Sequence, residues 1–149
     1  MTLDLDALRA LWRRRESLVV LQLGFGNGDA WLQMRRAWRE DAPQVARVHF
    51  IAIDPALCSA ADLCRAHAGT PQQPDADALA ALWPPLTRNL HRLLVDAGRW
   101  QLLLAPGDAL RWLPELQAPV DVFLIDEPDL SSDPQQAARR LAKGLARLA

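Results

Sequence analysis

Apolar runs alternate with amphipathic stretches along this chain of 149 residues. The apolar runs predict buried strands, because strands covered on both faces carry few polar side chains. They lie at about 18–23, 47–53, 100–105 and 120–125. Stretches with apolar residues three or four apart predict helices. They lie at about 3–15, 28–40, 57–67, 75–95 with a break at Trp83-Pro84-Pro85, 110–116 and 134–148. This alternation predicts an α/β fold with a doubly wound parallel sheet, and Asp75 or Asp77 is expected to cap the fourth helix.

Three glycines at alternate positions, Gly24, Gly26 and Gly28, follow the first predicted strand. Glycine permits positive φ and lets a ligand approach the backbone closely. A strand, a glycine turn and a helix start together predict a cradle for a nucleoside-containing cofactor. The spacing G-x-G-x-G is typical of class I S-adenosylmethionine (SAM) methyltransferases. A tight turn that binds nothing is the structural alternative.

A dinucleotide cofactor fits this turn less well. Its fingerprint requires Gly or Ala where this chain has Asp29. An acid at the helix start would also repel a pyrophosphate. An NAD-type oxidoreductase therefore stays an alternative that the spacing disfavours.

Acids follow the other three predicted strands, as Asp54, Asp108 and Asp126. Ligands of open α/β sheets bind outside the carboxyl ends of the strands, so these acids are expected on one rim with the glycine turn. Asp54 stands where an acid would accept hydrogen bonds from ribose hydroxyls. Each acid taken alone could equally form a turn. Their combination with the glycines predicts one ligand site.

Length and composition narrow the classes of protein to which the chain could belong. We expect one domain over residues 1–149, and a net charge of −1 gives no general attraction to nucleic acid. No apolar run approaches the ~20 residues of a membrane span. Cys58 and Cys64 match neither a zinc nor a redox motif, and the histidines show no metal spacing, so we expect reduced thiols, a cytoplasmic protein and no metal. Tryptophans at helical spacing predict core positions, whereas Trp112 could instead wall an adenine pocket; the core set is Trp12, Trp31 and Trp38.

From about residue 17 to 135, the chain resembles the methyltransferase module of MnmC, a family of bacterial bifunctional enzymes acting on the wobble uridine of tRNA. The likeness rests on motifs in one order along the chain. These are Leu23-Gly24-Phe25-Gly26-Asn27-Gly28, the strand ending in Asp54, Trp83-Pro84, Gly107-Asp108 and the strand ending in Asp126. The resemblance implies a Rossmann-like class I SAM-dependent methyltransferase fold with strand order 3-2-1-4. It also implies methyl transfer from SAM to the 5-aminomethyl group of the tRNA wobble uridine.

The resemblance also implies roles for single residues. The glycine turn would cradle the methionine part of SAM, Asp54 would bind the ribose, and Asp108 after Gly107 would hold the adenine amino group. Asp126 would orient the substrate amine or accept its proton as the catalytic residue. The cofactor-binding set is Gly24, Phe25, Gly26, Asn27, Gly28, Asp54, Gly107 and Asp108.

Three departures from the family pattern favour a domain that binds SAM weakly or has no catalytic activity. Gln22 replaces an acid, and an amide accepts a hydrogen bond without offsetting a positive charge, so weaker SAM binding is expected. Glu127-Pro128-Asp129 replaces a stretch with an aromatic residue, and its acids disfavour a phosphate backbone. The chain stops after the helix that follows the fourth predicted strand, where the fold usually continues, so C-terminal strands are expected to be missing. A truncation, a partner that covers the strand edge and a degenerate remnant are three explanations that the sequence leaves open. An exposed strand edge invites pairing with a second copy or a partner chain. The alternative function is therefore a non-catalytic methyltransferase-like domain that acts by association.

Overall fold

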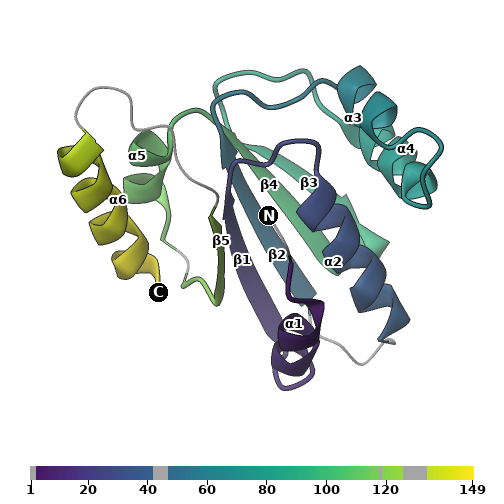
Figure 1. Cartoon of the computed structure of the whole chain (residues 1–149), viewed down its shortest axis with the longest axis horizontal. Coiled ribbons are helices and arrows are strands. Elements are labelled where there is room, and N and C mark those ends of the chain that lie inside the picture. Colours follow the sequence, from purple (N-terminus) through teal and green to yellow (C-terminus); the bar gives the residue numbers. More distant parts are fainter. Residues whose placement is uncertain (1–2, 42–46, 118, 126–133) are drawn as a thin grey trace.

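A five-stranded mixed sheet forms the centre of the computed structural model, with helices on both of its faces (Figure 1). The structure describes residues 3–41, 47–117, 119–125 and 134–149. The strands are β1 (Ser17–Leu23), β2 (Arg47–Asp54), β3 (His91–Val95), β4 (Trp100–Pro106) and β5 (Val122–Ile125). The helices are α1 (Leu5–Trp12), α2 (Asp29–Glu40), α3 (Ala60–Ala66), α4 (Gln73–Leu82), α5 (Ala109–Trp112) and α6 (Pro134–Leu148), with short 3-10 turns η1 (Asp96–Gly98) and η2 (Leu113–Glu115).

The strands lie side by side in the order β3-β4-β2-β1-β5. The four strands β4, β2, β1 and β5, which are the third, second, first and fourth of the predicted strands, run parallel. Parallel strands bring their carboxyl ends to the same rim. This rim carries the glycine turn after β1, Asp54 as the last residue of β2, and Asp108 after β4. Asp126 and the altered stretch Glu127-Pro128-Asp129 lie outside the described residues.

The edge strand β3 corrects the prediction of a helix that continues to Val95. It pairs antiparallel with β4, from His91 opposite Leu104 to Val95 opposite Trp100. Leu93 is buried while Arg92 and Leu94 are exposed, which is the alternation of a strand with one covered face. Pairing with β4 is a tertiary contact that outweighs the local helical spacing of its leucines. The sheet is consequently mixed rather than wholly parallel.

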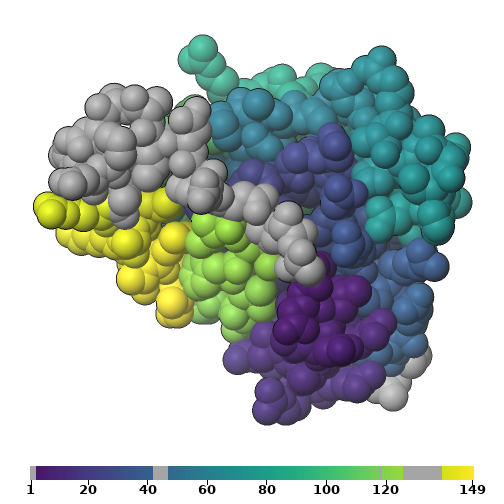
Figure 2. Space-filling model, in the orientation of Figure 1, coloured from purple at the N-terminus to yellow at the C-terminus, as the bar shows by residue number. Residues whose placement is uncertain are grey.

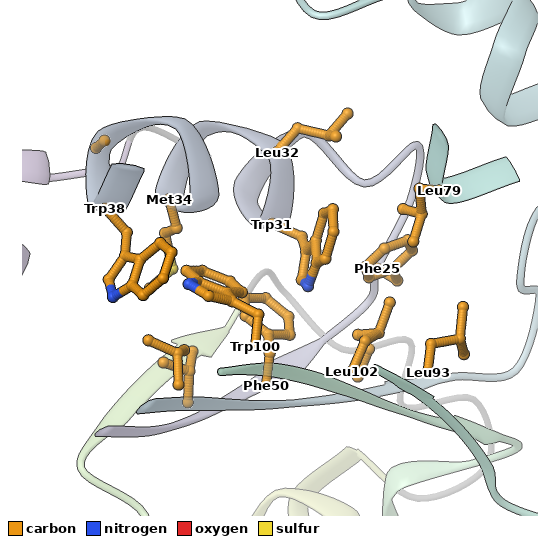
Figure 3. Close-up of a cluster of buried hydrophobic side chains, with 14 of the residues drawn as sticks. Phe25, Trp31, Leu32, Met34, Trp38, Phe50, Leu79, Leu93, Trp100 and Leu102 are labelled. Atoms are coloured by element: carbon orange, nitrogen blue, oxygen red, sulfur yellow. The ribbon is translucent and has the colours of Figure 1, made fainter. Parts of the chain in front are cut away.

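The larger core lies between one face of the sheet and helices α1, α2 and α4. Edge-to-face contacts join Trp100 of β4 to Trp31 and Trp38 of α2, with ring centroids 5.7 and 5.9 Å apart (Figure 3). Trp12 on α1 is fully buried in the same cluster. The prediction that the helical tryptophans are core residues is therefore confirmed, and each large apolar side chain buried this way contributes about 1.5–3 kcal/mol. This core holds α2 in place, and the start of α2 carries the glycine turn.

The second core is smaller and lies on the opposite face, beneath α5, η2 and α6. Leu21 and Ile53 from the sheet pack there with Leu113 and Leu141. In the space-filling view α6 occupies one side of the molecule and the α3–α4 pair the other (Figure 2). The two clusters thus hold the sheet between them and fix the rim on which its strands end.

Asp75 takes part in an ion-pair cluster and does not cap a helix. Helix α4 begins after Gln72 without a side-chain cap, so the prediction of Asp75 or Asp77 as its cap is wrong. Asp75 instead accepts hydrogen bonds from Arg35 at 3.2 Å and Arg39 at 2.6 Å, both on α2. A partner 36 or more positions away in sequence cannot be read from a local capping pattern, and this pairing ties α4 to the second half of α2.

Candidate cofactor-binding site

The turn between β1 and α2 has the backbone geometry that its glycines predict. Gly24, Gly26 and Gly28 adopt φ values of 84°, 59° and 77°, which side chains other than glycine rarely adopt. Gly28 is the N-cap of α2 in the left-handed conformation. A Cβ added at Gly24 or Gly26 would meet no atom within 4 Å, whereas one at Gly28 would lie 3.1 Å from the ring of Phe25. The first two glycines therefore face open space, and the third packs against the core.

Asp54 fixes this turn from the neighbouring strand. Its Oδ2 accepts a hydrogen bond from the Gly26 N–H at 3.2 Å, and its Oδ1 accepts one from the Ala56 N–H at 2.8 Å. The residue is only 7% exposed. Its own carbonyl accepts a hydrogen bond from the Gly107 N–H at 3.0 Å, which ties the end of β2 to the end of β4. Asp54 therefore connects three of the segments that sequence reasoning assigned to one site.

A cavity of about 260 Å³ opens beside the glycine turn. Four predicted residues, Gly24, Phe25, Gly26 and Asn27, line it, together with Leu3, Gln22, Asp29, Ala30 and Gln33. Gln22 is 4% exposed, and its side-chain oxygen has no hydrogen-bond partner. A buried acceptor without a donor is costly, so this oxygen marks a place where a ligand donor would be favourable. Asp54, Gly107 and Asp108 are not among the residues that line this cavity.

The Phe25 side chain belongs to the core rather than to the cavity. The residue is 2% exposed, and its ring stacks on Trp83 with ring centroids 5.8 Å apart. The Trp83 indole N–H in turn donates a hydrogen bond to the Cys58 carbonyl at 3.0 Å. Any contact of Phe25 with a ligand is therefore left to its backbone, and Trp83 packs against the ring of Phe25.

The corner after β4 is organised locally. Asp108 is exposed, and its Oδ1 accepts a hydrogen bond from the Leu110 N–H at 3.1 Å, which caps α5. Trp112 is 8% exposed and donates from its indole N–H to the Pro106 carbonyl at 2.9 Å. A Cβ at Gly107, whose φ is 141°, would lie 2.9 Å from that indole nitrogen. Glycine is needed here for the close approach of Trp112.

One residue at the turn was missed by sequence reasoning. His67 follows α3, is 3% exposed, and places its Nε2 2.8 Å from the Asn27 carbonyl oxygen. Its sequence neighbourhood shows neither metal spacing nor a catalytic motif, so no local signal could have found it.

Across the described ranges, no group of three or more His, Cys, Asp or Glu side chains is arranged to hold a metal ion. Cys58 and Cys64 are both free thiols, and burial raises the pKa of Cys58 above its usual range. Within the part of the chain that the structure describes, the helices are too short or too polar to cross a membrane.

Comparisons with curated proteins find relatives that share one name. No family model matches the chain. It is 40% identical over 129 residues to the tRNA 5-methylaminomethyl-2-thiouridine biosynthesis bifunctional protein MnmC of Thiobacillus denitrificans, covering 85% of this chain and 21% of the relative. The protein of the same name from Burkholderia multivorans is 38% identical over 148 residues, covering 97% of this chain and 22% of the relative. The chain thus spans about a fifth of the length of the curated relatives it matches.

A solved structure shares the fold. The crystal structure of MNMC2 from Aquifex aeolicus matches with a TM-score of 0.61 and 18% identity, covering 84% of this chain and 37% of that one. With sequence identities of 35–40% to several relatives, this chain is a relative of the MnmC proteins over nearly its whole length.

Proposed function

We propose that this chain is a SAM-dependent methyltransferase domain that acts in the cytoplasm on the 5-aminomethyl group of the wobble uridine in tRNA. The observation that carries the proposal is the cavity beside the glycine turn, with its buried and unpartnered Gln22 oxygen. The relatives' shared name, which specifies biosynthesis of 5-methylaminomethyl-2-thiouridine in tRNA, supports the substrate.

The donors and acceptors at the turn fit the amino-acid end of SAM. Its ammonium group needs an acceptor, which the Gln22 oxygen offers. Its carboxylate needs N–H donors, and the N–H groups of Phe25 and Asn27 donate no hydrogen bond within the described part of the chain. The dipole of α2 favours a carboxylate at this end of the helix, although Asp29, which lines the same cavity, opposes it. Donor and acceptor thus lie in one cavity, as an amino acid requires.

The nucleoside end would lie toward the ends of β2 and β4. Each Asp54 oxygen accepts one backbone N–H and keeps a further lone pair, so it could also accept a ribose hydroxyl. Gly107 is bonded to Asp54, and Asp108 follows directly, so an adenine amino group beyond the ribose would meet the Asp108 carboxylate. We assign these three residues to the adenosine on that basis.

When bound, SAM would supply an electrophilic methyl group on its sulfonium. Transfer to an amine is an in-line displacement, so this chain contributes position and the removal of a proton. The turn and Asp54 would hold one reactant in place. Asp126, which lies outside the described residues, is proposed to orient the substrate amine and to accept the proton that its nitrogen loses.

Two measurements test the proposal. Calorimetric titration with SAM and, separately, NAD should show saturable binding of SAM alone. With labelled SAM and tRNA that carries 5-aminomethyluridine, methyl transfer should fall about 100-fold in Asp126→Asn, since general-base catalysis contributes at least that much. The matched control Asp129→Asn should retain activity, and both variants should bind SAM normally. A folded chain that binds no SAM would overturn the proposal.

We also propose that the edge of β5 is a site of association with a second copy of the chain. Among the described strands β5 pairs only with β1, and Ile125 at its end is 39% exposed. Unpaired strand edges favour addition of another strand. Sedimentation equilibrium should show a dimer that Leu124→Pro abolishes. The Asp121 N–H donates to Val19 of β1, so the Leu124 N–H, three positions later, faces the free edge, and proline removes that donor. A wild-type chain that stays monomeric at high concentration would refute this association.

A further inference from the structure

His67 connects the α3–α4 region to the glycine turn. It lies immediately after α3, and its ring is buried with Nε2 2.8 Å from the carbonyl oxygen of Asn27. A carbonyl oxygen only accepts hydrogen bonds, so Nε2 carries the proton and donates. The ring therefore reaches a backbone atom 40 positions earlier in the chain.

This bond restrains one peptide plane of the turn from both sides. The carbonyl between Asn27 and Gly28 accepts from His67, and the N–H of the same peptide donates to the Phe25 carbonyl at 3.1 Å. One residue earlier, the Gly26 N–H is held by Asp54. A segment with three glycines loses much conformational entropy when ordered, so bonds that fix it before a ligand arrives reduce the cost of binding.

The backbone of His67 is held by its own surroundings. Its carbonyl accepts hydrogen bonds from the Thr70 N–H at 3.1 Å and the Thr70 hydroxyl at 2.7 Å. The exposed Asp29 carboxylate lies 3.7 Å from Nε2 and faces the same nitrogen. At the other end of α3, Ser59 and Asp62 form a capping box. These contacts make the position of the ring a fixed property of the fold.

We propose that His67 is a positioning residue: it orders the glycine turn through Asn27 and thereby sets the affinity for SAM. This inference rests on the proposed function, because it assigns the ordered turn to SAM binding. His67 does not line the cavity, so its effect on the ligand passes through the backbone of the turn.

Two variants separate the hydrogen bond from the volume of the ring. His67→Gln keeps an N–H donor at a similar reach, whereas His67→Met fills similar space without one. His49→Met is the matched control, because His49 bonds to Gln101 on β4 and lies away from the turn. For each variant we would measure the thermal midpoint, amide hydrogen exchange of residues 24–29 in the ligand-free chain, and the Kd for SAM by calorimetry.

We expect faster exchange in the turn and about fivefold to tenfold weaker SAM binding in His67→Met, as the loss of one hydrogen bond predicts. His67→Gln should restore most of the slow exchange and most of the SAM affinity. His49→Met should change neither the exchange of the turn nor the Kd for SAM. If the wild type binds SAM and His67→Met binds it equally well, the inference is wrong while the proposed function stands. If the wild-type chain binds no SAM, the proposed function fails and the inference fails with it.

Discussion

Asp54 is the last residue of β2 and Asp108 follows β4, a parallel strand of the same sheet, but the two carboxylates have different kinds of partner. Asp54 is 7% exposed and accepts N–H groups from two segments, the glycine turn and the residues after β2. Asp108 is exposed and accepts from Leu110, two positions further along its own segment. One carboxylate joins separate parts of the rim, while the other completes a local turn.

The difference shows that a carboxylate at a strand end can have either of two roles, which depend on whether its hydrogen-bond partners are distant or adjacent in sequence. A carboxylate with long-range partners organises the site whether or not a ligand is bound. A carboxylate satisfied by its own helix start needs a ligand to acquire any further role. The two corners should therefore respond differently to substitution, and the predictions below separate ligand binding from support of the fold.

The largest effect is expected for Asp54→Ala. Removing both oxygens leaves the Gly26 and Ala56 N–H groups without acceptors, which should lower the free energy of unfolding by about 1–3 kcal/mol. With the turn loosened and the ribose acceptor gone, SAM affinity should fall about 100-fold or more, the sum of two or three lost hydrogen bonds. Urea unfolding and calorimetry measure the two effects, and Asp54→Asn, which keeps one acceptor, should lie between. A folded Asp54→Ala chain with wild-type SAM affinity would show that Asp54 supports the fold but does not contribute to SAM binding.

A smaller effect is expected at the other corner, for Asp108→Ala. Loss of the cap on α5 should cost about 1 kcal/mol of stability, and loss of the adenine contact should weaken SAM binding about fivefold to tenfold. Asp108→Ser separates the two, because serine restores the cap without reaching a ligand. Recovery of stability alone would support the adenine assignment. Recovery of both stability and SAM affinity in Asp108→Ser would show that Asp108 only caps α5, whereas Asp54 acts in both the fold and the binding site.

The glycine corner could be predicted from sequence because its signals are local. The apolar run ending at Leu23 and the spacing of Gly24, Gly26 and Gly28 are read directly along the chain, and the structure has the strand, turn and helix start in that order. Positive φ at each glycine follows from the same pattern. Where a feature depends on neighbours in sequence, sequence reasoning found it.

The rest of the site depends on pairs that are far apart in sequence. His67 reaches Asn27 over 40 positions, and Asp75 reaches Arg35 over the same distance. Strand β3 is stabilised by β4 rather than by its own periodicity. No local pattern encodes such partners, which exist only after the sheet has assembled. The same limit explains why the Gln22 amide was recognised as a departure while its burial without a partner was not.

Gln22→Glu tests the cavity end of the site with a modest change in affinity. A carboxylate there would offset the ammonium charge of SAM, so the Kd should tighten about fivefold. The ligand-free chain should become less stable, because the carboxylate would be buried without a partner. Gln22→Leu removes the acceptor and should weaken binding while stabilising the free chain. Equal affinity in all three chains would place the amino-acid end of the cofactor elsewhere, and the glycine corner would lose its main functional support.

Asp41 supplies the limiting case of a carboxylate with a structural role only. It follows α2 at the end away from the glycine turn, and it accepts hydrogen bonds from Trp12 at 2.7 Å and from two nitrogens of Arg13 at 2.8 and 3.0 Å. The Arg13 hydrogen bonds are the main cause that holds the pKa of Asp41 below its ordinary value of 3.8. Asp41→Asn should leave the SAM Kd unchanged and lower stability at neutral pH, as urea unfolding would show.

The stability lost in Asp41→Asn should depend on pH in a direction that the lowered pKa of Asp41 determines. Because the pKa of Asp41 is lower in the folded chain, the unfolded chain binds more protons around pH 4 and the carboxylate stabilises the fold above that pH. The difference in unfolding free energy between wild type and Asp41→Asn should therefore be constant from about pH 7 to 5 and shrink as the pH falls through about 4 and below. A difference that grows toward acid pH would contradict the lowered pKa. A changed SAM Kd would instead show that the two ends of α2 are coupled, and that a carboxylate far from the rim also shapes the site.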